Sequence, residues 1–254
     1  MFLCLLILIC CYCSTEQLKA LISEAKSKNL FFMEALWTRF QPEIQFLQKN
    51  ILPKIEPIMH VSGTIGIPNE GISRLLEPEL GGGALMDIGV YPLTLISIAF
   101  NDQKPKTIHA ISSLDDKGID RFTSVQFKYK DEGAGNLFCT IETDTPDECV
   151  IVGKNGWAKL HAPFWCSTKL SVKTAADAKE YHYDFPIIDD ERKQYNFENS
   201  ALLQYEIAHA CEMLRGGKKE SDVYPLSYSV QFMEILDEIR KQIGLDFGKK
   251  EKAK

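Results

Sequence analysis

Eight short apolar or alternating segments between residues 57 and 185 constrain the fold more than any other feature of the chain. They are residues 57–67, 108–112, 122–129, 137–143, 150–152, 157–160, 170–172 and 181–185. In the third segment Val125, Phe127 and Tyr129 alternate with polar residues, as in a half-buried strand. Asn155-Gly156 is a strong hairpin signal, which makes the strands beside it antiparallel. So many strands with short turns predict a mostly antiparallel open sheet with one covered face.

Helical patterns flank this strand-rich region. Ser14 and Gln17 form a capping box, and a short buried strand is expected at 30–33. The apolar stripe of the first helix is Leu18, Leu21, Ile22 and Ala25, and those of the last two helices are Leu203, Ile207, Ala210, Cys211 and Leu214, and Phe232, Ile235, Leu236, Ile239 and Ile243. A further helix is expected at 41–50, ending near Pro53. We expect the last two helices to cover one face of the sheet, giving an α+β fold.

A glycine-rich turn, 81–83, runs into an apolar segment that ends at Phe100. Glycines adopt positive φ and let another backbone or a ligand approach closely. If the segment is helical, Asp87 and Tyr91 are four residues apart and lie on one face near its N-terminal end. Such a pair can act as an acid/base unit. The alternative is that Asp87 stabilises the first helical turn and Tyr91 packs in the core with its hydroxyl satisfied.

Charge and cysteine content exclude some classes of function. A net charge of −6 with a pI near 5.5 argues against nucleic acid or an anionic membrane as a partner. Four of the eight cysteines lie in the leader, and Cys139, Cys149, Cys166 and Cys211 are scattered without a CxxC pair or a histidine at ligand spacing. We therefore expect reduced, buried thiols, with no metal site and no disulfide framework.

The two ends of the chain differ from its body. Residues 1–13 are almost wholly apolar, which fits a signal-peptide core, a buried strand or the aberrant start of an incomplete gene model. The protein is expected to be cytoplasmic, or secreted if 1–13 act as a signal peptide. Residues 249–254 are basic and are expected to form a disordered tail.

The motif GGGALMDIGVYPL at 81–93 resembles the signature of the Gfo/Idh/MocA oxidoreductases, and within them of the dimeric dihydrodiol dehydrogenases. Segments 33–42, 164–168, 205–206 and 233–240 agree with it in the expected order. The resemblance implies a substrate-binding and dimerisation domain at 52–248, preceded at 14–51 by the remnant of a Rossmann domain. It also implies N-terminal truncation, because the chain has no G-x-G-x-x-G and relatives carry their cofactor half before the position of Ser14.

The resemblance also assigns site residues. Asp87 and Tyr91 match the family's catalytic pair, whose third member is a lysine that this chain does not carry before Gln17. That lysine matters because a tyrosine near its reference pKa of about 10 is a poor base at neutral pH without a nearby cation. Substrate-pocket aromatics are matched by Trp37, Trp165 and Phe197, although Trp165 and Phe197 could equally be apolar core. Arg39 could bind cofactor or substrate, or form a salt bridge that caps its loop.

These matches imply an NADP-dependent oxidoreductase that oxidises trans-dihydrodiols of aromatic hydrocarbons or D-xylose. They also imply a homodimer that forms through the open face of the sheet, with neither nucleic acid nor membrane as a partner. One alternative is a different sugar or inositol dehydrogenase of the same family. The other is a non-catalytic paralogue that acts as a dimerisation or binding module.

Overall fold

The computed structural model describes residues 4–8, 14–68, 71–130, 133–187 and 197–247. Its main feature is an eight-stranded sheet in the order β10-β9-β8-β7-β3-β6-β5-β4. The strands are β3 (Ile58–Gly66), β4 (Thr107–Leu114), β5 (Asp120–Lys128), β6 (Ala134–Thr140), β7 (Cys149–Gly153), β8 (Gly156–Leu160), β9 (Lys169–Thr174) and β10 (Asp177–Asp184). Each of the eight predicted segments forms one of these strands. Only the β3–β6 pair is parallel, so the predicted, mostly antiparallel sheet is confirmed.

A second, two-stranded sheet lies beside the N-terminal helix. β1 (Cys4–Leu8) and β2 (Phe31–Ala35) pair in parallel, and α1 (Thr15–Ser27) connects them along the chain. The Ser14 side chain caps α1 by accepting the Gln17 backbone N–H at 3.3 Å, as the capping box predicts. Within the leader, residues 4–8 thus form a strand. The tail at 249–254 lies outside the described residues.

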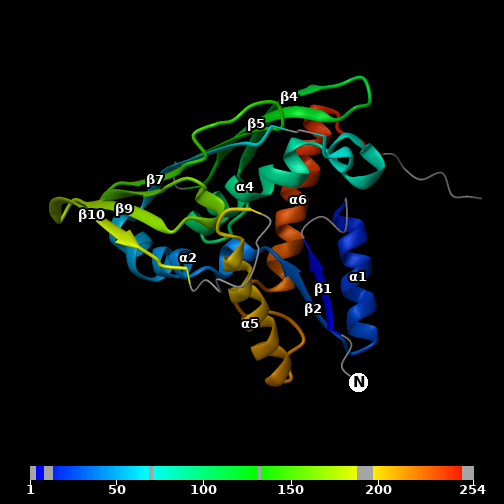
Figure 1. Ribbon diagram of the computed structural model, residues 1–254, viewed down its shortest axis with the longest axis horizontal. Coiled ribbons are helices and arrows are strands. Elements are labelled where there is room, and N and C mark those ends of the chain that lie inside the picture. Colours follow the sequence, from blue (N-terminus) through cyan, green and yellow to red (C-terminus); the bar gives the residue numbers. More distant parts are fainter. Residues whose placement is uncertain (1–3, 9–13, 69–70, 131–132, 188–196, 248–254) are drawn as a thin grey trace, which may run out of the picture.

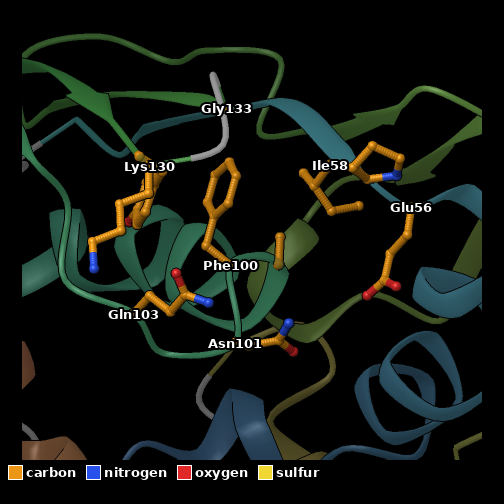
Figure 2. Close-up of a pocket in the computed structure, with 10 residues that line it drawn as sticks. Glu56, Ile58, Phe100, Asn101, Gln103, Lys130 and Gly133 are labelled. Atoms are coloured by element: carbon orange, nitrogen blue, oxygen red, sulfur yellow. The ribbon is translucent and has the colours of Figure 1, made fainter.

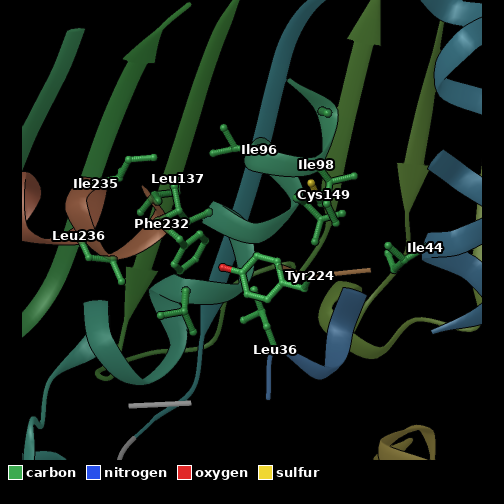
Figure 3. Packing of buried hydrophobic residues seen from close by; sticks show 14 of the residues in the cluster. Leu36, Ile44, Ile96, Ile98, Leu137, Cys149, Tyr224, Phe232, Ile235 and Leu236 are labelled. Carbon is green, nitrogen blue, oxygen red and sulfur yellow. The ribbon is translucent and has the colours of Figure 1, made fainter. Parts of the chain in front are cut away.

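Two helices cover one face of the large sheet (Figure 1). α4 (Val90–Ala99) packs on β3, β6 and β7. α6 (Leu226–Ile243) packs on β4 and also contacts α1 and β2, so it joins the two sheets. Figure 3 shows the continuous core that results, with Ile96 of α4, Leu137 of β6 and Phe232 of α6 among its members. On the other face Ile111 is 69% exposed, so that face is open as predicted.

Two helical predictions need correction. The helix expected to stop near Pro53 continues as α2 (Pro42–Phe46), the π-helical η2 (Leu47–Ile51) and α3 (Leu52–Ile55). Pro53 is tolerated because it lies in the first turn of α3, where its missing N–H breaks no α-helical hydrogen bond.

The second correction concerns α5 (Leu203–Arg215). It packs on β2 and on the 3₁₀ turn η1 (Trp37–Phe40), instead of beside α4 on the large sheet. Its buried side chains are Glu206, Ala210 and Met213, whereas Ile207 of the predicted stripe is 55% exposed. The predicted stripe was right at Ala210 and wrong at Ile207, because a buried carboxyl, Glu206, lies on the face that packs inward.

Candidate active site

Four aromatic side chains from distant parts of the sequence meet at one place. The ring centroids of Trp37 and Tyr91 lie 6.4 Å apart, those of Trp37 and Phe197 6.0 Å, and those of Tyr91 and Trp165 6.0 Å. Trp37 is buried, Tyr91 and Trp165 are half-buried, and Phe197 is 49% exposed. Two of the predicted substrate-binding aromatics, Trp37 and Trp165, therefore lie beside the predicted catalytic tyrosine, and the third, Phe197, packs on Trp37. Flat aromatic walls of this kind suit a cyclic ligand.

Hydrogen bonds tie the loops of this aromatic site to one another. The carbonyl of Trp165 accepts the Thr38 hydroxyl at 2.8 Å and the Gln41 side-chain amide at 2.9 Å, which fixes its loop against η1. The side-chain amide of Asn199 donates to the Cys166 carbonyl at 2.9 Å, which holds the segment after Phe197 against the same loop. Because each of these bonds joins separate segments, the aromatic walls are pre-arranged and need no ligand to assemble them.

Tyr91 lies at the start of α4, with its hydroxyl turned toward Trp37. The indole Nε1–H of Trp37 donates to the Tyr91 hydroxyl oxygen at 3.3 Å. A hydrogen bond donated to that oxygen favours the phenolate over the phenol, because it stabilises developing negative charge. The geometry can therefore support proton transfer at the Tyr91 oxygen.

Asp87 lies before Tyr91 in a π-helical turn, η5 (Leu85–Gly89), instead of in a regular α-helix. Residues four apart still lie close to one face in a π turn, whose hydrogen bonds run from i to i+5, so this geometry leaves the expected shared face of Asp87 and Tyr91 in place. The Asp87 carboxylate forms an ion pair with Arg74 at 2.7 Å, in the 3₁₀ turn η3 (Ser73–Leu76). Nothing in the sequence marked Arg74, because only tertiary contact brings η3 to η5.

Arg39 is turned into the protein. Its side chain is 3% exposed and both terminal nitrogens bind the carboxylate of Asp102, one of them at 3.1 Å. The guanidinium also lies 4.3 Å from the centre of the Tyr224 ring. Of the alternatives for Arg39, this geometry favours a structural salt bridge, although the partner lies after α4 and not in the arginine's own loop.

Two buried carboxyl groups near the aromatic site were not predicted. Glu206 is 2% exposed, and burial raises its pKa to about 7. Glu43 is 1% exposed, and burial likewise raises the pKa of its carboxyl well above the usual value. Glu43 lies on α2 and Glu206 on α5, and a search of the sequence for apolar stripes does not detect a buried carboxyl on either helix. Within the described part of the chain, no group of three or more His, Cys, Asp or Glu residues could hold a metal ion.

A separate cavity of about 380 Å³ lies at the other end of α4 (Figure 2). Its walls include Ile58, Phe100, Asn101 and Lys130. Tyr91 and Phe100 are nine residues apart, so the cavity is roughly 14 Å along the helix from Tyr91. None of the predicted site residues lines it.

The described residues do not fit a whole dinucleotide. Arg39, the one predicted cofactor ligand, is held by Asp102. The glycine-rich turn 81–83, which could cradle a phosphate, is filled by the protein itself: a Cβ added at Gly82 would lie 2.6 Å from the Leu75 carbonyl oxygen, and one at Gly83 2.0 Å from Asp120 Oδ1. The described residues therefore form a cluster of aromatic side chains without a phosphate-binding loop.

Comparison with known proteins gives three kinds of match. The family model described as GFO/IDH/MocA C-terminal domain matches residues 54–159. The trans-1,2-dihydrobenzene-1,2-diol dehydrogenase of Oryctolagus cuniculus is 34% identical over 236 residues, covering 92% of this chain and 70% of the relative. The enzyme of the same name from Homo sapiens is 34% identical over 235 residues, covering 92% and 68%.

Solved structures share the fold. The aldose-aldose oxidoreductase of Caulobacter crescentus, complexed with glycerol, aligns with a TM-score of 0.74 at 18% identity over 92% of this chain and 68% of the other. KijD10, a 3-ketoreductase from Actinomadura kijaniata in complex with NADP and TDP-benzene, aligns with a TM-score of 0.76 at 15% identity over 94% and 71%. Levoglucosan dehydrogenase, in complex with NADH and levoglucosan, aligns with a TM-score of 0.75 at 17% identity over 91% and 69%.

Proposed function

This chain belongs to the Gfo/Idh/MocA oxidoreductases, and from that premise we propose that it binds a hydroxylated ring in the aromatic site and exchanges the hydroxyl proton through Tyr91. The observation that carries the proposal is the packing of Trp37 and Trp165 beside the Tyr91 ring, with Phe197 against Trp37. Tyr91, Trp165 and Phe197 keep exposed surface beside the buried Trp37, and aromatic side chains gathered in this way from separate segments are typical of ligand sites.

Oxidation of a hydroxyl to a carbonyl removes a proton from oxygen and a hydride from carbon. In this proposal Tyr91 reacts as the phenolate and becomes the neutral phenol when it accepts the proton, and the Trp37 indole N–H stabilises the negative charge that the oxygen carries before the transfer. Trp165 and Phe197 hold the ring of the substrate by its faces and exclude water. Asp87, paired with Arg74, would act on Tyr91 only through the field of that ion pair.

The finer identity of substrate and cofactor follows the relatives. We propose a trans-dihydrodiol of an aromatic ring as the substrate, because the relatives in two mammals carry that name, with D-xylose as the sugar alternative. NADP is the proposed hydride acceptor, since a structural neighbour is complexed with it. Because this sequence lacks a phosphate-binding loop, we expect the chain to bind NADP more weakly than the low-micromolar range.

The test uses the purified chain and its tryptophans. Two of the three, Trp37 and Trp165, line the proposed site, so trans-1,2-dihydrobenzene-1,2-diol should change the emission of a Trp157→Phe variant.

Oxidation of the substrate is followed by the absorbance of the NADPH that forms. Tyr91→Phe should keep ligand binding but lower turnover about 10²- to 10⁴-fold, the usual contribution of acid/base catalysis. Tyr228→Phe, on exposed α6 surface, is the matched control and should change neither.

Three outcomes separate the alternatives. Turnover of Tyr91→Phe within about threefold of the parent would contradict the assignment of the base. Binding without turnover at any NADP concentration would favour the non-catalytic binding paralogue, a reading supported by the missing phosphate loop. A low-micromolar NADPH affinity would overturn the expectation of a weak dinucleotide site.

We also propose that the open face of the large sheet pairs with a second copy of the chain. Its supporting observation is apolar exposure: Ile111 is 69% exposed on β4, whose other face is half-buried, and Val152 is 36% exposed on β7, whose other face is buried. Ile111→Glu should therefore weaken a dimer in sedimentation experiments at tens of micromolar. A parent protein that is monomeric at that concentration would refute the proposal.

A further inference from the structure

The helix that carries Asp87 and Tyr91 is closed at its N-terminal end by a carboxylate from another element. Asp120, the first residue of β5, is fully buried. Its Oδ2 accepts the backbone N–H of Leu85 at 2.8 Å and the hydroxyl of Thr123 at 2.7 Å. The first N–H groups of a helix have no partner within the helix, and its N-terminal end is positive, so a carboxylate there is stabilising.

The glycine-rich turn makes this approach possible. Gly83 has φ +109°, and a Cβ placed on it would lie 2.0 Å from Asp120 Oδ1. The Gly83 N–H meanwhile donates to the Leu75 carbonyl at 3.0 Å, which holds the turn in place. The turn that could have received a ligand therefore receives the Asp120 side chain.

The π turn lies between the N–H group that Asp120 accepts and Tyr91. The contact of Asp120 therefore controls the direction in which the Tyr91 side chain points. The segment Leu85–Gly89 is π-helical, and Gly89 presses against Cys139, whose Sγ would lie 2.9 Å from an added Cβ. If the first turn came loose and the segment relaxed by one residue to an α-helix, every later side chain would rotate by about 100°. Tyr91 would then leave the Trp37 indole.

We propose that Asp120 is a positioning residue for the proposed reaction: by holding the Leu85 N–H it sets the register of the π turn and keeps the Tyr91 hydroxyl against Trp37 Nε1. The inference rests on the proposed role of Tyr91. The charge of Asp120 takes part, since charged acceptors form the stronger hydrogen bonds. Burial raises the pKa of Asp120 to about 6, and the thiol of Cys139 on β6 is the titratable group that feels its charge.

The experiment observes the Trp37 indole N–H directly by NMR in ¹⁵N-tryptophan-labelled protein. Loss of the signal in Trp37→Phe assigns it, and Tyr91→Phe gives its position without the hydrogen bond. Asp120→Asn should move the signal at least half of the way toward that position. Asp237→Asn is the matched control, because the Asp237 carboxylate accepts the Thr15 N–H at 2.8 Å at the start of α1, away from the aromatic site. It should leave the Trp37 signal unchanged.

A pH titration of the parent protein keeps the test decisive if Asp120→Asn fails to fold. The Trp37 signal should shift as the pH falls through about 6, and Tyr91→Phe should remove that shift. In an active preparation Asp120→Asn should lower kcat about tenfold or more with KM nearly unchanged. A Trp37 signal that neither Asp120→Asn nor low pH moves would overturn the inference. A shifted signal with normal Tyr91→Phe turnover would instead reject the proposed base and leave the positioning role standing.

Discussion

Replacing Asp102 by alanine is the sharpest test of how the aromatic loop is held. Arg39 and Asp102 have side chains only 3% and 12% exposed, and their bond is bidentate. Removing one partner leaves an uncompensated buried charge, which costs about 3–5 kcal/mol. Asp102 also has φ +52°, where an alanine adds about 1–2 kcal/mol of backbone strain. The expected loss in free energy of unfolding is therefore about 4–7 kcal/mol.

The neighbouring residue supplies the control. Asn101 has φ +53°, nearly the same backbone conformation, but an exposed side chain. Asn101→Ala should thus report the strain alone, about 1–2 kcal/mol. The difference between the two variants in urea unfolding measures the ion pair. Trp37, two residues before Arg39, should also shift its emission in Asp102→Ala and not in Asn101→Ala.

The result has a bearing on function. If Arg39 were a cofactor ligand that only rests on Asp102, the two variants would differ by less than about 1 kcal/mol, as solvent-exposed ion pairs do. That outcome would refute the structural interpretation of Arg39 and return it to the list of possible cofactor ligands.

Three further predictions concern stability. Burial raises the pKa of Glu206 to about 7, above its usual value of 4.5, so the contribution of Glu206 to stability should be greatest below pH 4.5 and should be lost as the pH rises to about 7. Glu206→Gln should remove that contribution, of up to about 3 kcal/mol, in urea unfolding at pH 5 and 8. Burial lowers the pKa of His161, so the folded state resists protonation, and the contribution of His161 to stability should fall as the pH drops below 6.5; His161→Gln should remove that contribution. Gly153→Ala should cost about 1–3 kcal/mol, because its Cβ would lie 1.8 Å from the Ile55 carbonyl oxygen, whereas Gly216→Ala, with no atom nearer than 3.5 Å, should change little.

The large sheet could be predicted from the sequence because alternation is a local signal. Val125, Phe127 and Tyr129 are all buried, as their spacing of two requires for one face of a strand. The hairpin at Asn155-Gly156 also forms, with Gly153 paired to Gly156. The face of α5 could not be predicted in this way. Its inward position is taken by Glu206, and a carboxyl there breaks the pattern that identifies a buried stripe.

The aromatic residues of the site could be predicted from the sequence, but the local structure that holds them in place could not. Resemblance to a family identified Trp37, Tyr91, Trp165 and Phe197, and these four do meet. The π turn at η5 leaves no trace in composition, since the same residues could form an α-helix.

The carboxylates of Asp87 and Asp120, both near the start of that helix, show that local spacing and burial can point to different residues. A spacing of four made Asp87 the natural partner of Tyr91, yet its carboxylate pairs with Arg74, a side chain that is 52% exposed. Ion pairs at such exposed places contribute little free energy, so the Asp87 pair is a weak anchor. Asp120 lies 33 residues after Asp87 with no motif around it, but it is fully buried and accepts the Leu85 N–H in the first turn of the helix. Local spacing therefore singled out a half-buried carboxylate with an exposed partner, whereas burial and the N–H groups at the helix start identify Asp120 as the one that orients Tyr91.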